Sequence, residues 1–190
     1  AVDLNPMPAE EILGELRWEN LGSLIADIPP ERQSVVSRIH EAGTVEQAVG
    51  GVFGNIGDKL EQGDLLVVWL FDASGSLVDD RQRVAREMEK FFEGFKSRKS
   101  DDAAAFMHAA VAFGGSVREL VGPTKPNRAI IDAVRNVPVD ASGLENVFSA
   151  VEWAVNRYGK RWKHAIEIVV WADESGDDLA RLERTIAVCQ

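Results

Sequence analysis

An unbroken apolar run, Leu65 to Phe71, is the feature of this sequence that most constrains the fold. The run shows no alternation of apolar and polar residues, and it is too short to cross a membrane. It therefore predicts a strand that is buried on both faces, as at the centre of a parallel sheet. The run ends at once in three oxygen-bearing side chains, Asp72, Ser74 and Ser76.

The three polar residues alternate with the two small residues Ala73 and Gly75, which allow the loop to fold their oxygens toward one point. One carboxylate and two hydroxyls suit Mg²⁺, Mn²⁺ or Ca²⁺, and they leave positions on an octahedral ion for water, a further carboxylate or a ligand. The alternative is a plain turn, because Asp, Ser and Gly often turn the chain after a strand.

The remaining apolar patterns predict an α/β fold with a doubly wound, mainly parallel sheet flanked by helices. A capping box, Thr44 with Gln47, opens the first of the helices in this region. We expect helices near 44–60, 84–95, 129–134, 144–158 and 177–186, strands at 65–71, 106–113 and 165–171, and a short edge strand at 119–121. Residues 1–43 are expected to form an N-terminal helical extension to the domain at 44–190.

A second apolar run, 165–171, ends as the first does, because Asp173 follows it closely. Ligands of doubly wound sheets bind outside the carboxyl ends of the strands, where the winding direction reverses. We therefore expect Asp72 and Asp173 to face one crevice. The segment Asp140 to Asn146, which precedes a predicted helix, provides a third acidic candidate.

Composition narrows the choice of partners. The chain has 190 residues and a net charge of -10, which argues against nucleic acid or an anionic membrane as a partner. Cys189 is the only cysteine, so the chain has no intrachain disulfide and no thiolate metal cluster. The three histidines have no metal-ligand spacing. A divalent metal or a protein partner fits this composition better.

The residues around the first apolar run resemble the von Willebrand factor A (vWA) domain, over about residues 44–190. That family binds a divalent metal at a metal-ion-dependent adhesion site (MIDAS), built from D-x-S-x-S after the first strand, a threonine before a later helix, and an aspartate after the fourth strand. Asp72, Ser74 and Ser76 match the first element letter for letter, and Asp173 matches the last.

Two departures from the family pattern stand out. The threonine position falls on Glu145, which would add charge to the metal and could displace a water or a partner carboxylate; if Ser142 shifts into the site instead, a hydroxyl is kept. The chain also ends after the helix that follows the fourth strand, where the family would continue. Because it begins at Ala1 rather than at methionine, we expect an upstream segment, which favours an extracytoplasmic or membrane-tethered protein.

The resemblance implies an adhesion or scaffold module whose cation, Mg²⁺ or else Mn²⁺ or Ca²⁺, is completed by an acidic side chain of a protein partner. A scaffold of the same fold without metal is the alternative. A metal-assisted phosphoryl transferase or hydrolase is a further one, but Ser74 stands where aspartyl-phosphate chemistry usually needs a second acid, and no G-x-S-x-G, H-E-x-x-H or Walker motif is present. We therefore expect a binding protein that is not an enzyme and that does not insert this segment into a membrane.

Overall fold

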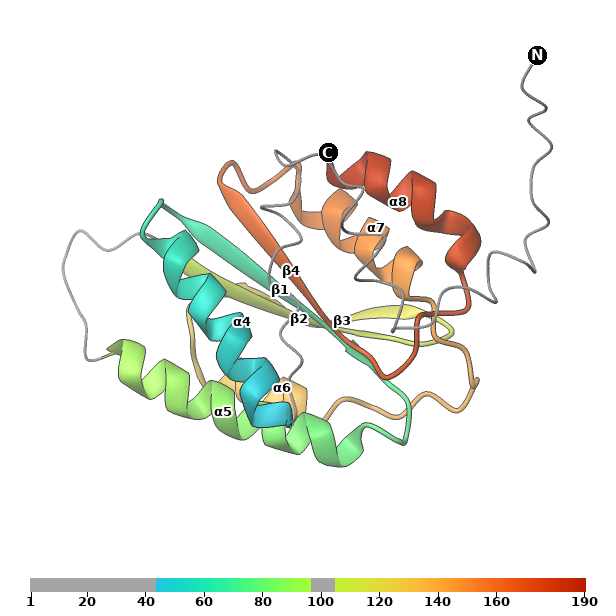
Figure 1. Cartoon of the computed structure of the whole chain (residues 1–190), viewed down its shortest axis with the longest axis horizontal. Helices are drawn as coiled ribbons and strands as arrows, with labels where there is room; N and C mark the ends of the chain where they lie inside the picture. Colours follow the sequence, from blue (N-terminus) through green and yellow to red (C-terminus); the bar gives the residue numbers. More distant parts are fainter. Residues whose placement is uncertain (1–43, 97–104) are drawn as a thin grey trace, which may run out of the picture. The chain divides into compact units, whose positions relative to one another are not determined.

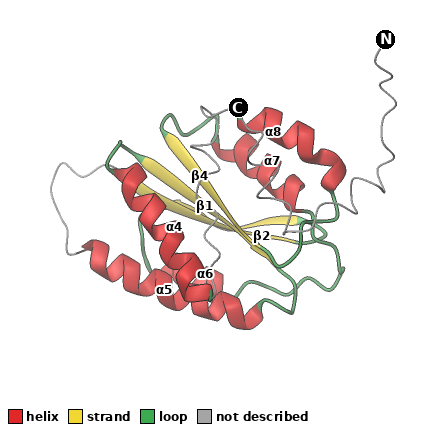
Figure 2. Ribbon diagram, viewed as in Figure 1, coloured by secondary structure: helices red, strands yellow, loops and turns green. Residues whose placement is uncertain are grey.

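The computed structural model of the protein describes residues 44–96 and 105–190, and the helical extension expected at 1–43 lies outside them. Helices and strands alternate over most of this region (Figures 1 and 2). The elements are α4 (Val45–Leu60), β1 (Leu65–Asp72), α5 (Val78–Lys96), β2 (Phe106–Phe113), β3 (Val117–Thr124), α6 (Arg128–Arg135), α7 (Val147–Tyr158), β4 (Ala165–Trp171), the 3₁₀ helix η2 (Leu179–Arg181) and α8 (Leu182–Cys189).

The four strands form one sheet in the order β3-β2-β1-β4. Strand β1 pairs in parallel with both β2 and β4, whereas β2 and β3 are antiparallel. The prediction of an α/β fold with a mainly parallel, helix-flanked sheet is therefore confirmed at this level. The edge strand expected at 119–121 is longer than predicted, because it runs from Val117 to Thr124 beside β2.

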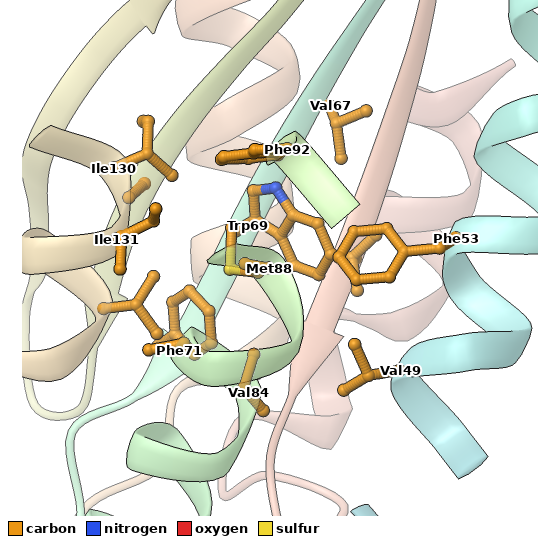
Figure 3. Close-up of a cluster of buried hydrophobic side chains, with 14 of the residues drawn as sticks. Val49, Phe53, Val67, Trp69, Phe71, Val84, Met88, Phe92, Ile130 and Ile131 are labelled. Carbon is orange, nitrogen blue, oxygen red and sulfur yellow. The ribbon is translucent and has the colours of Figure 1, made fainter. Parts of the chain in front are cut away.

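Strand β1 is buried along its whole length, as its unbroken apolar sequence predicts. Its side chains alternate between two apolar clusters, one on each face of the sheet. Trp69 and Phe71 lie in the cluster that α4, α5 and α6 cover (Figure 3), and Leu70 lies in the cluster that α7 covers. Helices thus pack on both faces, and β1 is held at the centre of the sheet.

Three details of the predicted elements need correction. The last strand, β4, is only partly buried, with Val170 38% exposed, so it is not a second strand buried on both faces. The helix expected to begin at Leu144 begins at Val147, and Leu144 is exposed. Asp177 does not open the last helix; it lies in the loop before η2. In contrast, the side chain of Thr44 accepts from the Gln47 amide as the capping box predicts.

The described residues contain no helix with the length and apolar character needed to span a membrane.

Candidate metal centre

Strands β1 and β4 are parallel neighbours, so their carboxyl ends meet at the same edge of the sheet. Asp72 is the last residue of β1, Asp173 follows β4, and Glu145 lies in the loop before α7. One carboxylate oxygen from each of the three lies within 4.8 Å of the others. The three acidic residues, which we call the carboxylate cluster, therefore come together from separate segments as the sequence predicts.

Asp72 is the most buried member of the cluster, with only 1% of its surface exposed. Its Oδ1 atom accepts a hydrogen bond of 2.6 Å from the backbone amide of Ser74, which fixes the carboxylate in the loop. Its Oδ2 atom is buried and has no hydrogen-bond partner among the described residues, and the same is true of Glu145 Oε2. A buried carboxylate oxygen without a donor is costly, so the two carboxyl groups need either a shared proton or a cation between them.

The two predicted serines lie beside the cluster. The hydroxyls of Ser74 and Ser76 are 3.0 Å apart, and that of Ser76 donates to Asp173 Oδ2 over 2.8 Å. This chain of contacts joins the loop after β1 to the loop after β4. The structure thus brings together five of the six predicted site residues: Asp72, Ser74, Ser76, Glu145 and Asp173.

Ser142, the sixth, organises its own loop. Its amide donates to Asp140 Oδ1 over 2.7 Å, and its hydroxyl accepts from the Leu144 amide over 3.2 Å. Asp140 also accepts from the Gly115 amide, and hydrogen bonding by the Ser142 side chain, the Ser142 amide and the Gly115 amide lowers the pKa of the Asp140 carboxyl. Of the two candidates for the threonine position, Glu145 therefore lies in the carboxylate cluster and Ser142 does not.

The backbone of Glu145 is fixed from the loop after β4. Its amide donates to Asp177 Oδ2 over 2.7 Å, and its carbonyl accepts from the Asp177 amide over 2.9 Å. Gly176 lets the two loops approach so closely, because it has a φ of +92° and a Cβ atom there would lie 2.8 Å from Val147 Cγ2.

The start of α7 is capped from the same loop. The Asp178 carboxylate accepts from the amides of Phe148 and Ser149 and from the Ser149 hydroxyl, whereas Asn146 at the N-cap position makes no side-chain cap bond. An acidic side chain is favourable at this positive end of a helix. Sequence reasoning assigned Asp177 to the last helix and so missed that the Asp177-Asp178 pair serves α7 and Glu145.

Arg81 is a further residue that the sequence pattern did not identify. It is 2% exposed, and its guanidinium donates to the backbone carbonyls of Asp72 and Ser74 over 2.7 and 2.9 Å. Burial lowers the pKa of Arg81, and the negative charges of Asp72 and Asp173 oppose that effect. Arg81 thus holds the backbone of the loop that contains Asp72 and Ser74, and its positive charge partly balances the negative charge of the carboxylate cluster.

The electrostatics of the cluster are most visible at Glu145. Burial, followed by the charges of Asp72, Glu174 and Asp173 and by a hydrogen bond that a protonated Glu145 can share with the Asp72 carboxylate, raises the pKa of Glu145 to about 7. Without a cation, the cluster therefore relieves its repulsion by keeping a proton. Carboxylates and hydroxyls that converge on one point are the donors that hard divalent cations prefer, so these residues fit such an ion.

No protein-family model matches the chain, and no curated protein matches it. Among solved structures, the chain is similar to one titled "Crystal structure of three N-terminal domains of the type V pili tip protein Mfa5 from Porphyromonas gingivalis". The two are 17% identical, the TM-score is 0.44, and the match covers 57% of this chain and 19% of the other. A likeness of this extent assigns neither a family nor a function.

Proposed function

We propose that this protein is a divalent-metal-dependent protein-binding module of the vWA type. The observation that carries the proposal is the buried, unpartnered Oδ2 atom of Asp72, which lies in a cluster with Glu145 and Asp173. In this proposal Asp72, Ser74 and Ser76 hold the cation, Glu145 is a further ligand while no partner is bound, and Asp173 either contacts the ion or orients Ser76. An acidic side chain of a partner protein completes the site.

The sheet order supports a doubly wound, vWA-like arrangement. The order β3-β2-β1-β4 corresponds to the first four strands of a doubly wound sheet, although β3 is antiparallel here. Helix α5, after β1, packs on one face, and α7, before β4, packs on the other. The winding thus reverses between β1 and β4, and Asp72 and Asp173 follow these two strands, at the point where such folds bind ligands.

A protein partner is supported by apolar side chains that are exposed near the candidate site. Val78 begins α5 just after Ser76, and Leu144 precedes Glu145; these side chains are 39% and 48% exposed. Val139 is 57% exposed, and it lies near Gly75, since a Cβ atom added to Gly75 would be 3.9 Å from Val139 Cγ1. Apolar groups around a polar centre are typical of a surface that binds another protein.

The chain's own residues prepare the site, and the bound cation supplies positive charge to an incoming oxygen. Arg81 holds the backbone of the first loop, and Asp177 holds that of Glu145, so the ligand atoms are arranged before the ion binds. Ser76 keeps Asp173 oriented through their hydrogen bond. This preorganisation lowers the cost of binding the ion and then the partner.

Thermal unfolding with and without metal tests the proposal. Mg²⁺ or Mn²⁺ is expected to raise the melting temperature, since an ion at a hundred times its dissociation constant adds about 2.7 kcal/mol of stability. Asp72→Ala and the more conservative Asp72→Asn should abolish the increase. Glu93→Ala, which removes an exposed acid on α5, should retain it. A wild-type melting temperature that stays constant at millimolar metal would favour a metal-free scaffold of the same fold.

We also propose that the module is not an enzyme. Ser74 stands two residues after Asp72, where aspartyl-phosphate chemistry usually needs an acid, and its backbone amide is hydrogen-bonded to the Asp72 carboxylate. Assays with phosphate esters, nucleotides and peptides in the presence of Mg²⁺ or Mn²⁺ should give no turnover. Hydrolysis that disappears in Asp72→Asn would instead assign a metal-assisted hydrolase.

A further inference from the structure

We propose that Glu145 is a tethered competitor of the partner's acidic group. It serves as a carboxylate ligand supplied by the chain itself, so an acidic partner must displace it to reach the cation. This inference rests on the proposed metal-dependent binding function and specifies which residue controls access to the metal.

The side chain of Glu145 already points into the site. One of its carboxylate oxygens lies within 4.8 Å of oxygens of Asp72 and Asp173. Its Oε2 atom is buried without a hydrogen-bond partner among the described residues, as is Oδ2 of the 1% exposed Asp72. Buried acceptor atoms of this kind need a proton or a cation, and a divalent cation would take the place of the proton that the metal-free cluster keeps.

The backbone on both sides of Glu145 is held, so the carboxylate remains near the site. Two hydrogen bonds join Glu145 to Asp177, and the Asn146 amide donates to the Gly114 carbonyl over 3.3 Å. Only side-chain rotation then separates the bound and displaced positions of the carboxylate. A tethered ligand acts at a high effective concentration, and a free carboxylate must compete against it.

The charges explain why displacement is expected rather than addition. Asp72, Asp173 and an ionised Glu145 carry three negative charges, which already exceed the two positive charges of the ion. A fourth carboxylate would be repelled by this excess, which the buried Arg81 only partly balances. Exchanging Glu145 for a partner carboxylate leaves the total charge at the ion unchanged, so this is the favourable route.

Two consequences follow for the isolated protein. It should hold a divalent ion without a partner, because its own third carboxylate takes part in binding. It should also bind simple carboxylates at the ion more weakly than a variant that lacks this group. The substitution Glu145→Gln removes the charge with little change in shape, so this variant should bind simple carboxylates at the ion more tightly than the wild type does.

Binding of Mn²⁺ to the full chain, followed by electron paramagnetic resonance and by water-proton relaxation, separates these effects. Glu145→Gln should bind Mn²⁺ about tenfold more weakly. Once saturated, it should give a higher relaxation rate per bound ion, since a water replaces the carboxylate. Acetate should lower that rate at a several-fold lower concentration than in the wild type. Glu145→Thr, a second variant with a neutral side chain, should behave like Glu145→Gln.

Glu174→Gln is the matched control, because Glu174 raises the pKa of Glu145 through its charge but is not a member of the carboxylate cluster. It should keep the wild-type relaxation rate and acetate response. If Glu145→Gln and Glu145→Thr both match the wild type in these two measurements, Glu145 is not a ligand and the inference is overturned while the metal site stands. If the wild type shows no Mn²⁺ binding that depends on Asp72, the proposed function fails as well.

Discussion

Asp177 forms hydrogen bonds with both the backbone amide and the backbone carbonyl of Glu145. The Glu145 amide donates to the Asp177 carboxylate over 2.7 Å, and the Asp177 amide donates to the Glu145 carbonyl over 2.9 Å. The pair joins the loop before α7 to the loop after β4, which also carries Asp173. The loops that carry two of the three clustered carboxylates, Glu145 and Asp173, are therefore joined directly by hydrogen bonds.

Replacing Asp177 with alanine should affect both stability and metal binding. The variant loses the side-chain hydrogen bond to the Glu145 amide, which should cost about 1 to 2 kcal/mol of unfolding free energy. Because Glu145 is then less well held, Mn²⁺ affinity should also fall. Urea unfolding and Mn²⁺ titration measure the two effects.

Asp178→Ala provides the comparison for that prediction. It removes the bonds that cap α7 and should cost a similar amount of stability, about 1 to 2 kcal/mol. Its metal affinity should fall less, because the Glu145-Asp177 pair remains. Equal losses of Mn²⁺ affinity in both variants would mean that general loosening, and not the position of Glu145, controls the site.

Arg81→Met is expected to destabilise the protein by about 3 kcal/mol. The substitution leaves the carbonyls of Asp72 and Ser74 without their charged donor, and each such bond to a charged group is worth about 1.5 to 3 kcal/mol. Metal affinity should also fall, since the loop is no longer held. Arg81→Lys keeps the charge but replaces the guanidinium, whose Nη1 donates to both carbonyls, and should lose part of the stability and part of the metal affinity. Denaturant unfolding and metal titration measure the two effects. An Arg81→Met variant as stable as the wild type would contradict the prediction.

The sequence was sufficient to predict the residues whose role depends on strand ends. The unbroken apolar run marked β1, so Asp72, Ser74 and Ser76 could be assigned to its carboxyl end, and the second run located Asp173 in the same way. These assignments did not require β4 to be fully buried, and it is not. Parallel pairing alone brings two strand ends to one edge.

Residues that act through long-range contacts were harder to identify. Arg81 occupies a core-facing position on the stripe that includes Leu77, Val84 and Met88, and an arginine in an apolar stripe is the signal that could have identified it. Asp177 gives no comparable signal, since an acid before a helical pattern is normally assigned as its cap. Its contact with Glu145 spans 32 residues and depends on the tertiary fold.

His108 should make the protein less stable in acid. Its ring is buried beside Phe92 and Phe106, its Nδ1 accepts from Trp69 Nε1 over 3.0 Å, and burial lowers its pKa to about 3 from an ordinary 6.5. Between pH 6.5 and 3 the unfolded chain therefore binds a proton that the folded chain does not, and stability falls as the pH falls through this window. Denaturant unfolding at several pH values should show a weaker acid-side loss in His108→Gln than in the wild type.

Trp69→Phe is the control for His108. It removes the hydrogen bond and lowers stability, but it keeps the buried imidazole, so it should retain the pH dependence that His108→Gln loses. The interpretation is wrong if the difference in unfolding free energy between His108→Gln and the wild type is the same at pH 7 and pH 4.

Glu145 should give the metal-free protein a pH dependence of the opposite sign. Burial and the neighbouring acids raise its pKa to about 7 from an ordinary 4.5, so between these values the folded chain holds a proton that the unfolded chain releases. The contribution of this proton to stability is complete below pH 4.5 and is lost as the pH rises to 7.

Glu145→Gln removes this loss, so in a chelating buffer the stability of the variant relative to the wild type should increase from pH 4.5 to pH 7. Saturating Mg²⁺ should reverse the ranking at pH 7, because the ion then offsets the repulsion and uses the carboxylate that the variant lacks. Unfolding curves of both proteins, with and without Mg²⁺ at each pH, test the prediction, and a ranking that is the same under all four conditions would contradict it.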